Sequence, residues 1–147
     1  MTQTVTIRKL LSASREEVFD AWLDPEGMRT WMCPPTITGA DVELDPRVGG
    51  QFRIVMKGPD ADIVNTGEYR VLDRPEKLQF TWVSTRWANQ ETLVTVELRE
   101  QDTQCELILT HERFPMPQSP RQLEGGWNEM LNKFARYLAA PRGELRP

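Results

Sequence analysis

Apolar and polar residues alternate along the first ten residues and again through most of the middle of the chain. Val5 and Ile7 fall on one face of a predicted strand over residues 2–11. The period of two returns at residue 40 and continues to residue 111, broken by loops rich in glycine, proline and aspartate. This pattern predicts six more strands, near residues 40–44, 52–56, 67–71, 78–82, 92–98 and 105–111. Because one face of each strand is apolar and the other polar, we expect an antiparallel sheet covered on one side.

Two short helices are predicted directly after the first strand. Ser14 and Glu17 have the spacing of a capping box, in which each side chain binds the other residue's backbone amide. The helix that follows carries Trp22 on its apolar face and stops before a proline. That proline, Pro25, is suited to the first position of a second helix, which we expect to run to Trp31.

A long helix near the C-terminus is expected to cover the apolar face of the sheet. Its large apolar residues recur at spacings of four, three, one, three and four between Leu123 and Leu138, which is the pattern of one helical face. Pro141 and Gly143 end this helix, and the tail from about residue 141 is expected to fray. We therefore predict that the apolar face of the sheet and the apolar face of this helix pack together to form one core.

Composition and charge exclude several classes of function. The chain of 147 residues has 18 Lys and Arg against 22 Asp and Glu, and its longest basic cluster is Arg8-Lys9, so no nucleic-acid partner is expected. No apolar run is long enough to cross a membrane, and the N-terminus lacks the order of a secretory signal, which predicts a cytoplasmic protein without membrane insertion. Two cysteines and one histidine do not form a zinc set. We therefore expect no metal and no cofactor.

Seven short motifs, in a fixed order, resemble one protein family. They are Asp24-Pro25-Glu26, Asp45-Pro46-Arg47-Val48-Gly49-Gly50-Gln51-Phe52-Arg53, Gly67-Glu68-Tyr69, Pro75-Glu76-Lys77-Leu78, Phe80-Thr81-Trp82, Leu109-Thr110-His111-Glu112 and Gly126-Trp127. Together they resemble the family named after the C-terminal domain of the activator of the ninety-kilodalton heat-shock protein's ATPase, within the START-like or SRPBCC superfamily. The resemblance spans about residues 3–140.

The resemblance implies an α+β helix-grip fold, with seven antiparallel strands curled around the last helix and two short helices after the first strand. It implies a single START-like domain over residues 1–147. Members of the superfamily commonly hold lipids, sterols or polyketides between sheet and helix, and some are cyclases or hydrolases. The chain lacks the separate N-terminal domain of the eukaryotic activators, so a chaperone role transfers poorly. It also departs from the family at Trp31-Met32-Cys33-Pro34, where two tryptophans, a glycine and a proline are usual.

Large rings on the inner faces predict a cavity for a small hydrophobic or aromatic ligand. A sheet wrapped around a single helix leaves a wedge, and wedges lined by rings and a few polar groups commonly bind ligands. Core packing is the competing explanation for the same rings. Tyr69 and His111 are the expected polar contacts. The candidate ligand-binding residues are Trp31, Phe52, Tyr69, Phe80, Trp82, His111, Trp127, Met130 and Phe134.

Two other functions remain open at the level of sequence. In the first, His111 is a general acid or base in a cyclase or hydrolase, with Tyr69 as a hydrogen-bond donor. No orienting carboxylate can be placed beside His111, so a structural histidine is the alternative and a protein that is not an enzyme is favoured. In the second, the Trp87 loop and residues 114–117 form an apolar patch for a partner, a chaperone included. The pattern does not choose between a monomer and a homodimer.

Overall fold

Seven strands form one antiparallel sheet in a computed structural model that describes residues 2–32, 39–58, 61–85, 89–115 and 120–139. The strands lie in the spatial order β1-β7-β6-β5-β4-β3-β2, which places β1 and β2 at the two edges. Their bounds are β1 Thr2–Leu11, β2 Ala40–Leu44, β3 Gln51–Met56, β4 Ile63–Asp73, β5 Lys77–Ser84, β6 Glu91–Gln101 and β7 Gln104–Pro115. From β2 onward each strand pairs with the next along the chain, and β7 closes against β1.

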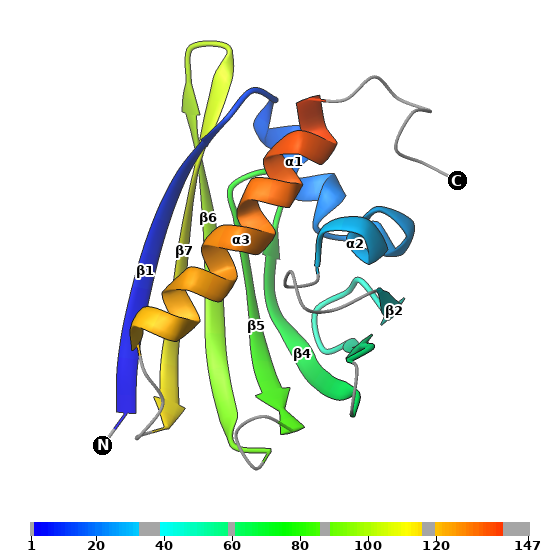
Figure 1. The fold of residues 1–147 in the computed structure, drawn as a ribbon. Coiled ribbons are helices and arrows are strands. Elements are labelled where there is room, and N and C mark those ends of the chain that lie inside the picture. Colours follow the sequence, from blue (N-terminus) through cyan, green and yellow to red (C-terminus); the bar gives the residue numbers. More distant parts are fainter. Residues whose placement is uncertain (1, 33–38, 59–60, 86–88, 116–119, 140–147) are drawn as a thin grey trace.

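Three helices lie on the concave face of this curved sheet (Figure 1). Helices α1 (Arg15–Ala21) and α2 (Pro25–Trp31) belong to the connection that carries the chain from one edge strand to the other. Helix α3 (Pro120–Ala139) runs diagonally across the same face. It packs on β1 and α2, while α2 also packs on β2. The interior is therefore enclosed by the sheet on one side and by three helices on the other.

The two short helices begin where the local sequence satisfies their first amides. The Glu17 amide donates to Ser14 Oγ over 3.1 Å, and the Ser14 amide donates to the Glu17 carboxylate, which completes the capping box. At α2 the Glu26 amide donates to Asp24 Oδ1 over 3.2 Å, and Pro25 occupies the first turn. These caps fix where both helices start, and the second helix places Trp31 at its end.

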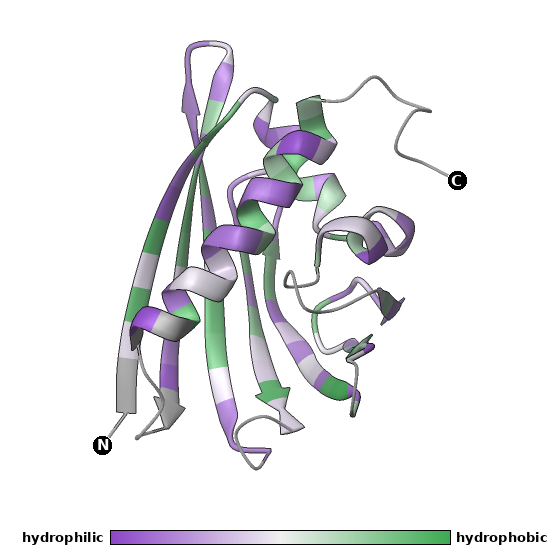
Figure 2. Cartoon of the chain, in the orientation of Figure 1, coloured by the Kyte–Doolittle hydropathy of each residue, from purple (hydrophilic) through white to green (hydrophobic). Residues whose placement is uncertain are grey.

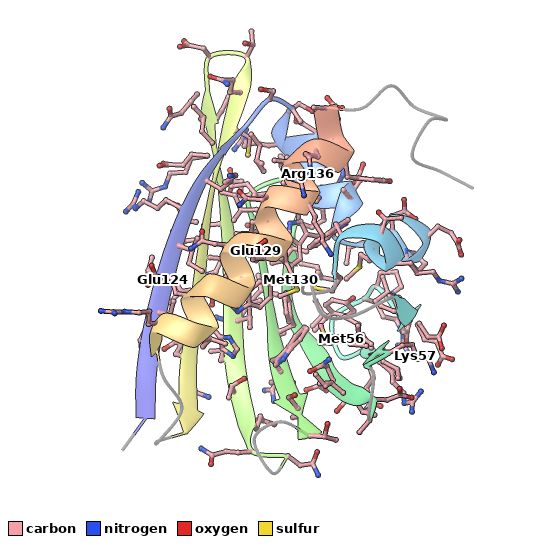
Figure 3. The ribbon with its side chains drawn as sticks, viewed as in Figure 1. Met56, Lys57, Glu124, Glu129, Met130 and Arg136 are labelled. Atoms are coloured by element: carbon pink, nitrogen blue, oxygen red, sulfur yellow. The ribbon has the colours of Figure 1, made fainter. Side chains whose placement is uncertain are left out.

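Apolar residues gather on the inner surfaces, as the hydropathy colouring in Figure 2 shows. On α3, Trp127, Met130, Leu131 and Phe134 are buried, whereas Glu124, Glu129 and Arg136 are exposed (Figure 3). Every strand from β2 to β7 contributes buried side chains to the same cluster. One face of the sheet and one stripe of the helix thus form one core.

The predicted fold is confirmed in its class, topology and element order: a seven-stranded curved antiparallel sheet grips a C-terminal helix, with two short helices after the first strand. In the described part of the chain, no helix is both long enough and apolar enough to cross a membrane. The predicted frayed tail, Trp87 and most of the 114–117 loop lie outside the described residues, so those predictions stay predictions.

Candidate functional site

One end of the core holds a buried chain of hydrogen bonds centred on His111. This histidine lies on β7 and has no exposed surface. The indole Nε1–H of Trp127, on α3, donates to His111 Nδ1 over 3.1 Å. His111 Nε2 lies 2.8 Å from Thr92 Oγ1 on β6, and that hydroxyl donates to the Trp82 carbonyl over 2.6 Å. The chain joins β5, β6, β7 and α3.

The directions of these bonds determine the state of the imidazole. Because Trp127 donates to Nδ1, that nitrogen carries no proton. Because the Thr92 hydroxyl gives its proton to a carbonyl, it accepts from His111, and the imidazole is neutral with its proton on Nε2. Burial lowers the pKa of His111 to about 3, which agrees with this neutral form. Both ring nitrogens are therefore engaged in holding sheet and helix together.

These hydrogen bonds agree with the structural role that the sequence offered as the alternative to catalysis, and a catalytic role of His111 stays a prediction. The partners of its ring nitrogens are Thr92 and Trp127, and neither nitrogen is turned to Tyr69. The Tyr69 ring instead contacts Phe52 at a centroid distance of 5.5 Å and Phe80 at 6.2 Å.

A second region of the core, between α2 and the strands β2–β5, encloses a small cavity. Its wall contains no ionised side chain. The lining residues are Trp22, Met28, Met32, Leu44, Phe52, Ile54, Tyr69, Phe80 and Trp82. The free space is about 10 Å³, which is room for about one water molecule.

The rings of the cavity wall pack closely against one another. Phe52 lies 5.5 Å from Phe80 and 5.8 Å from Trp82 between ring centroids, and Phe80 lies 6.2 Å from Trp22. Gly67 makes the position of Phe52 possible, because a Cβ there would come within 2.5 Å of the Phe52 ring and 1.9 Å of the Thr81 carbonyl oxygen. The wall is therefore rigid on the side of the sheet.

Tyr69 supplies the hydroxyl of the cavity wall. It is 3% exposed, and burial raises the pKa of its phenol well above the usual value, with a smaller contribution from the Asp45 carboxylate. The group therefore stays protonated and is able to donate or accept a hydrogen bond.

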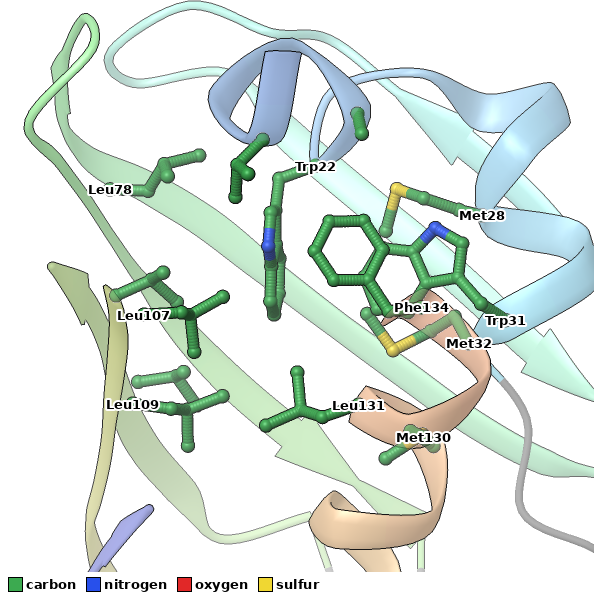
Figure 4. Packing of buried hydrophobic residues seen from close by; sticks show 14 of the residues in the cluster. Trp22, Met28, Trp31, Met32, Leu78, Leu107, Leu109, Met130, Leu131 and Phe134 are labelled. Atoms are coloured by element: carbon green, nitrogen blue, oxygen red, sulfur yellow. The ribbon is translucent and has the colours of Figure 1, made fainter. Parts of the chain in front are cut away.

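Two buried indole groups near the cavity have no hydrogen-bond partner within the part of the chain that the structure describes. They are the Nε1–H donors of Trp22 and Trp31, on residues that are 2% and 0% exposed. The rings of the two residues meet edge to face at 4.9 Å between centroids (Figure 4). Trp31 also packs on Phe134 of α3 at 4.4 Å. This part of the core is apolar apart from the two indole N–H groups, which meet no acceptor among the described residues.

The structure divides the predicted ligand-binding residues into two groups. Phe52, Tyr69, Phe80 and Trp82 line the cavity, while Trp31, His111, Trp127, Met130 and Phe134 are buried beside it without lining it. Sequence reasoning missed five lining residues, namely Trp22, Met28, Met32, Leu44 and Ile54. A signal existed for Trp22 and Met28, which fall on the inner sides of two recognisable short helices. The list of ligand contacts itself stays a prediction.

A larger groove lies on the other face of the sheet, across β2–β5. Its volume is about 730 Å³ and its wall is mostly charged and polar, with Glu43, Arg53 and Glu68 among its residues. Leu44 and Phe52 belong to both the groove and the inner cavity. These two side chains are thus the partition between the surface and the interior.

The described thiol, Cys105, is a packing residue of the core. Cys105 is buried in the core, and burial raises the pKa of its thiol to about 11. Cys33 lies outside the described residues. Within the described ranges, no three His, Cys, Asp or Glu side chains gather in a way that would hold a metal ion.

Comparison with solved structures finds the same fold in proteins of low sequence identity. Protein CV1439 from Chromobacterium violaceum matches with a TM-score of 0.83 at 22% identity, over 94% of this chain and 99% of that one. A protein from Rhodobacter sphaeroides matches with a TM-score of 0.80 at 20% identity, over 96% and 100%. A protein of unknown function from Staphylococcus aureus, SA2116, gives 0.78 at 20%, over 94% of each chain. At these identities the likeness shows the fold alone.

The comparison with protein families is more specific. Curated proteins give no match to the chain. A family model, described as activator of Hsp90 ATPase homolog 1-like protein, matches residues 12–139, which includes all three helices and the sheet from β2 to β7. The chain therefore belongs to the family of activator of Hsp90 ATPase homolog 1-like proteins, with the START-like fold of that group.

Proposed function

We propose that this protein binds a small apolar or aromatic molecule in the cavity between the sheet and α2. The observation that carries the proposal is the wall of that cavity. Five aromatic residues and two methionines surround it, and the polar side-chain groups of the lining residues are the Tyr69 hydroxyl and the indole N–H groups of Trp22 and Trp82. Such walls, apolar with a few polar groups, are typical of small-molecule sites.

The free space of the cavity is about 10 Å³, so a ligand larger than a water molecule has to displace side chains in order to fit. The strand-borne rings pack against each other and against the Gly67 backbone, which makes them poor candidates for movement. Met28 and Met32 are the adaptable part of the wall, because an unbranched thioether repacks at low cost. Met32 replaces the second tryptophan that the family resemblance leads one to expect here, and it lines the cavity.

The partition formed by Leu44 and Phe52 offers a second route from the surface. Leu44 is partly exposed and belongs to the edge strand β2, whose outer side has no neighbouring strand. Movement of its side chain would join the inner cavity to the outer groove. This residue is therefore the point at which a bulky substitution tests whether the cavity is used.

A partner-binding role finds less support in the described residues. The large hydrophobic side chains exposed there are Leu10, on β1, and Val48, in the turn between β2 and β3. These two elements are at opposite edges of the sheet, so the two residues do not form one patch. The name of the family suggests contact with a chaperone, and Trp87 with residues 114–117 remains the predicted surface for it.

The test is a search for ligands by two independent readouts. Native mass spectrometry of the freshly purified protein detects a molecule that stays bound, and thermal denaturation with a panel of aromatic and lipid-like compounds detects those added. A ligand present at a hundred times its dissociation constant stabilises the folded state by about 2.7 kcal/mol, which raises the melting temperature by about 5 °C or more.

A matched pair of variants on β2 locates the effect. Leu44→Trp fills the cavity and should abolish the ligand-dependent shift, whereas Glu43→Trp adds the same ring on the outer face and should leave it unchanged. No bound molecule and no shift across a broad panel would overturn the proposal. A shift that survives in Leu44→Trp would place the ligand elsewhere.

A further inference from the structure

The two unpartnered indole donors are the least expected feature of the core. Nearly all buried N–H groups in folded proteins have a hydrogen-bond partner, and a buried donor without one costs stability. Trp22 and Trp31 each hold such a donor among the described residues, within a single cluster of rings. An acceptor supplied by a bound molecule would relieve this cost for whichever of the two donors it can reach.

Trp31 is the donor placed to meet such a partner. In Figure 4 the nitrogen-bearing edge of its ring is turned toward Met28, and Met28 lines the cavity. Contacts with Trp22 and Phe134 hold the Trp31 ring in place. Met28 is therefore the cavity-lining residue toward which this donor is turned, and its thioether is only a weak acceptor.

Trp22 is placed differently, although its ring is part of the cavity wall. Its indole packs among four other rings, those of Trp31, Phe80, Trp127 and Phe134. Figure 4 shows Leu78 and Leu107 beyond it on the side away from Met28. Nothing in the structure supplies a partner for the Trp22 donor, and it serves below as the control.

We propose that the ligand of the cavity carries a neutral hydrogen-bond acceptor, a carbonyl or ether oxygen on an apolar body, which takes the Nε1–H of Trp31 once Met28 has moved aside. The inference rests on the proposed function and specifies the chemistry of its ligand. An indole nitrogen donates and never accepts, so the ligand group has to be an acceptor. Among the described residues no cationic side chain lines the cavity, so an ionised carboxylate or phosphate would lose its hydration without compensation.

The experiment compares two molecules of equal shape that differ in one atom. Acetophenone carries a carbonyl oxygen, and α-methylstyrene has a methylene group in its place. Each is titrated into ¹⁵N-labelled protein, and the indole N–H signals of the five tryptophans are followed by NMR. Trp31→Phe assigns the Trp31 signal, and a nuclear Overhauser contact with the Met28 methyl group assigns it independently of that variant.

The expected result has two parts. Acetophenone moves the Trp31 indole proton downfield, as a new hydrogen bond does, while α-methylstyrene does not. Acetophenone also binds about fivefold more tightly, the ratio that corresponds to one net hydrogen bond. Trp31→Phe removes this preference, and Trp22→Phe retains it even if the affinity for both molecules changes.

The failures of the two proposals are distinguishable. Equal binding of both molecules without a downfield shift at Trp31 overturns the inference and leaves the ligand cavity standing. A shift of the Trp22 signal in place of the Trp31 signal likewise overturns it. Absence of binding by either molecule, at concentrations up to their solubility, counts against the inference and the proposed function together.

Discussion

The core of this protein contains two regions with buried hydrogen-bonding groups, and the groups are paired in one region and unpaired in the other. Around His111, each donor meets an acceptor: Trp127 donates to the imidazole, the imidazole to Thr92, and Thr92 to the Trp82 carbonyl. Around Trp31, two indole donors meet none. Both regions are sealed from water, and both use tryptophan.

The difference suits the two regions to different roles, the first to holding the fold together and the second to the proposed binding of a ligand. A satisfied polar chain joins sheet and helix at low cost and fixes their register. An unsatisfied buried donor destabilises the folded state, and under the proposal above an acceptor on the ligand would relieve that penalty. The histidine, which from its chemistry alone is the first candidate for function, belongs to the first kind of region. The proposed ligand cavity adjoins it at Trp82 and lies beside α2.

The largest effect is expected from His111→Ala. The change leaves a cavity and removes the partners of the Trp127 indole and the Thr92 hydroxyl, so we expect the free energy of unfolding to fall by about 3–5 kcal/mol. Urea denaturation followed by circular dichroism measures it. His111→Gln keeps a donor and an acceptor and should lose less. Equal losses in both variants would mean that volume, and not hydrogen bonding, fixes this residue.

A smaller effect is expected from pH, with a sign that follows from the depressed pKa of His111. The folded state holds the imidazole neutral down to about pH 3, whereas the unfolded chain takes up a proton near pH 6.5. Between these values the unfolded state binds more protons, so the stabilisation is complete above pH 6.5 and is lost as the pH falls. We expect a loss of about 2 kcal/mol between pH 7.5 and pH 5.

His111 is the only histidine in the chain, which makes the control for this pH effect direct. Urea denaturation of His111→Gln at the same two pH values should show little change, since no other side chain with a pKa near 6.5 remains. A loss of the same size in the variant would assign the effect to carboxylates. Such a result would break the link between the buried chain of hydrogen bonds and acid sensitivity.

The sequence predicted the fold because its signals are local and repeated. Alternation located the strands, the Ser14–Glu17 capping box located α1, and the spacing of apolar residues located α3. It also placed His111 on the inner face, where it lies. These features depend on neighbours along the chain, and a single sequence records them well.

The partners of the inner side chains were beyond the reach of the same reasoning. The Trp127–His111 bond depends on how α3 crosses β7, and the sequence sets no rotation for that helix. The cavity is narrow because residues of α1 and α2 fill the wedge, Trp22 and Met28 in particular. Sequence periodicity shows which face of a helix is apolar, but not which residues of a distant strand that face will contact.

The smallest expected effect is the difference in stability between two tryptophan-to-phenylalanine variants, one from each region. Trp127→Phe and Trp22→Phe remove the same ring portion and the same N–H group from residues that are each 2% exposed. Loss of Trp127 leaves His111 Nδ1 without its donor, whereas loss of Trp22 removes a donor that had no partner. We therefore expect Trp127→Phe to be more destabilising by about 1–2 kcal/mol in urea denaturation. Equal costs would show that the indole N–H at His111 contributes nothing to folding, and the contrast between the two regions would then rest on geometry without energetic consequence.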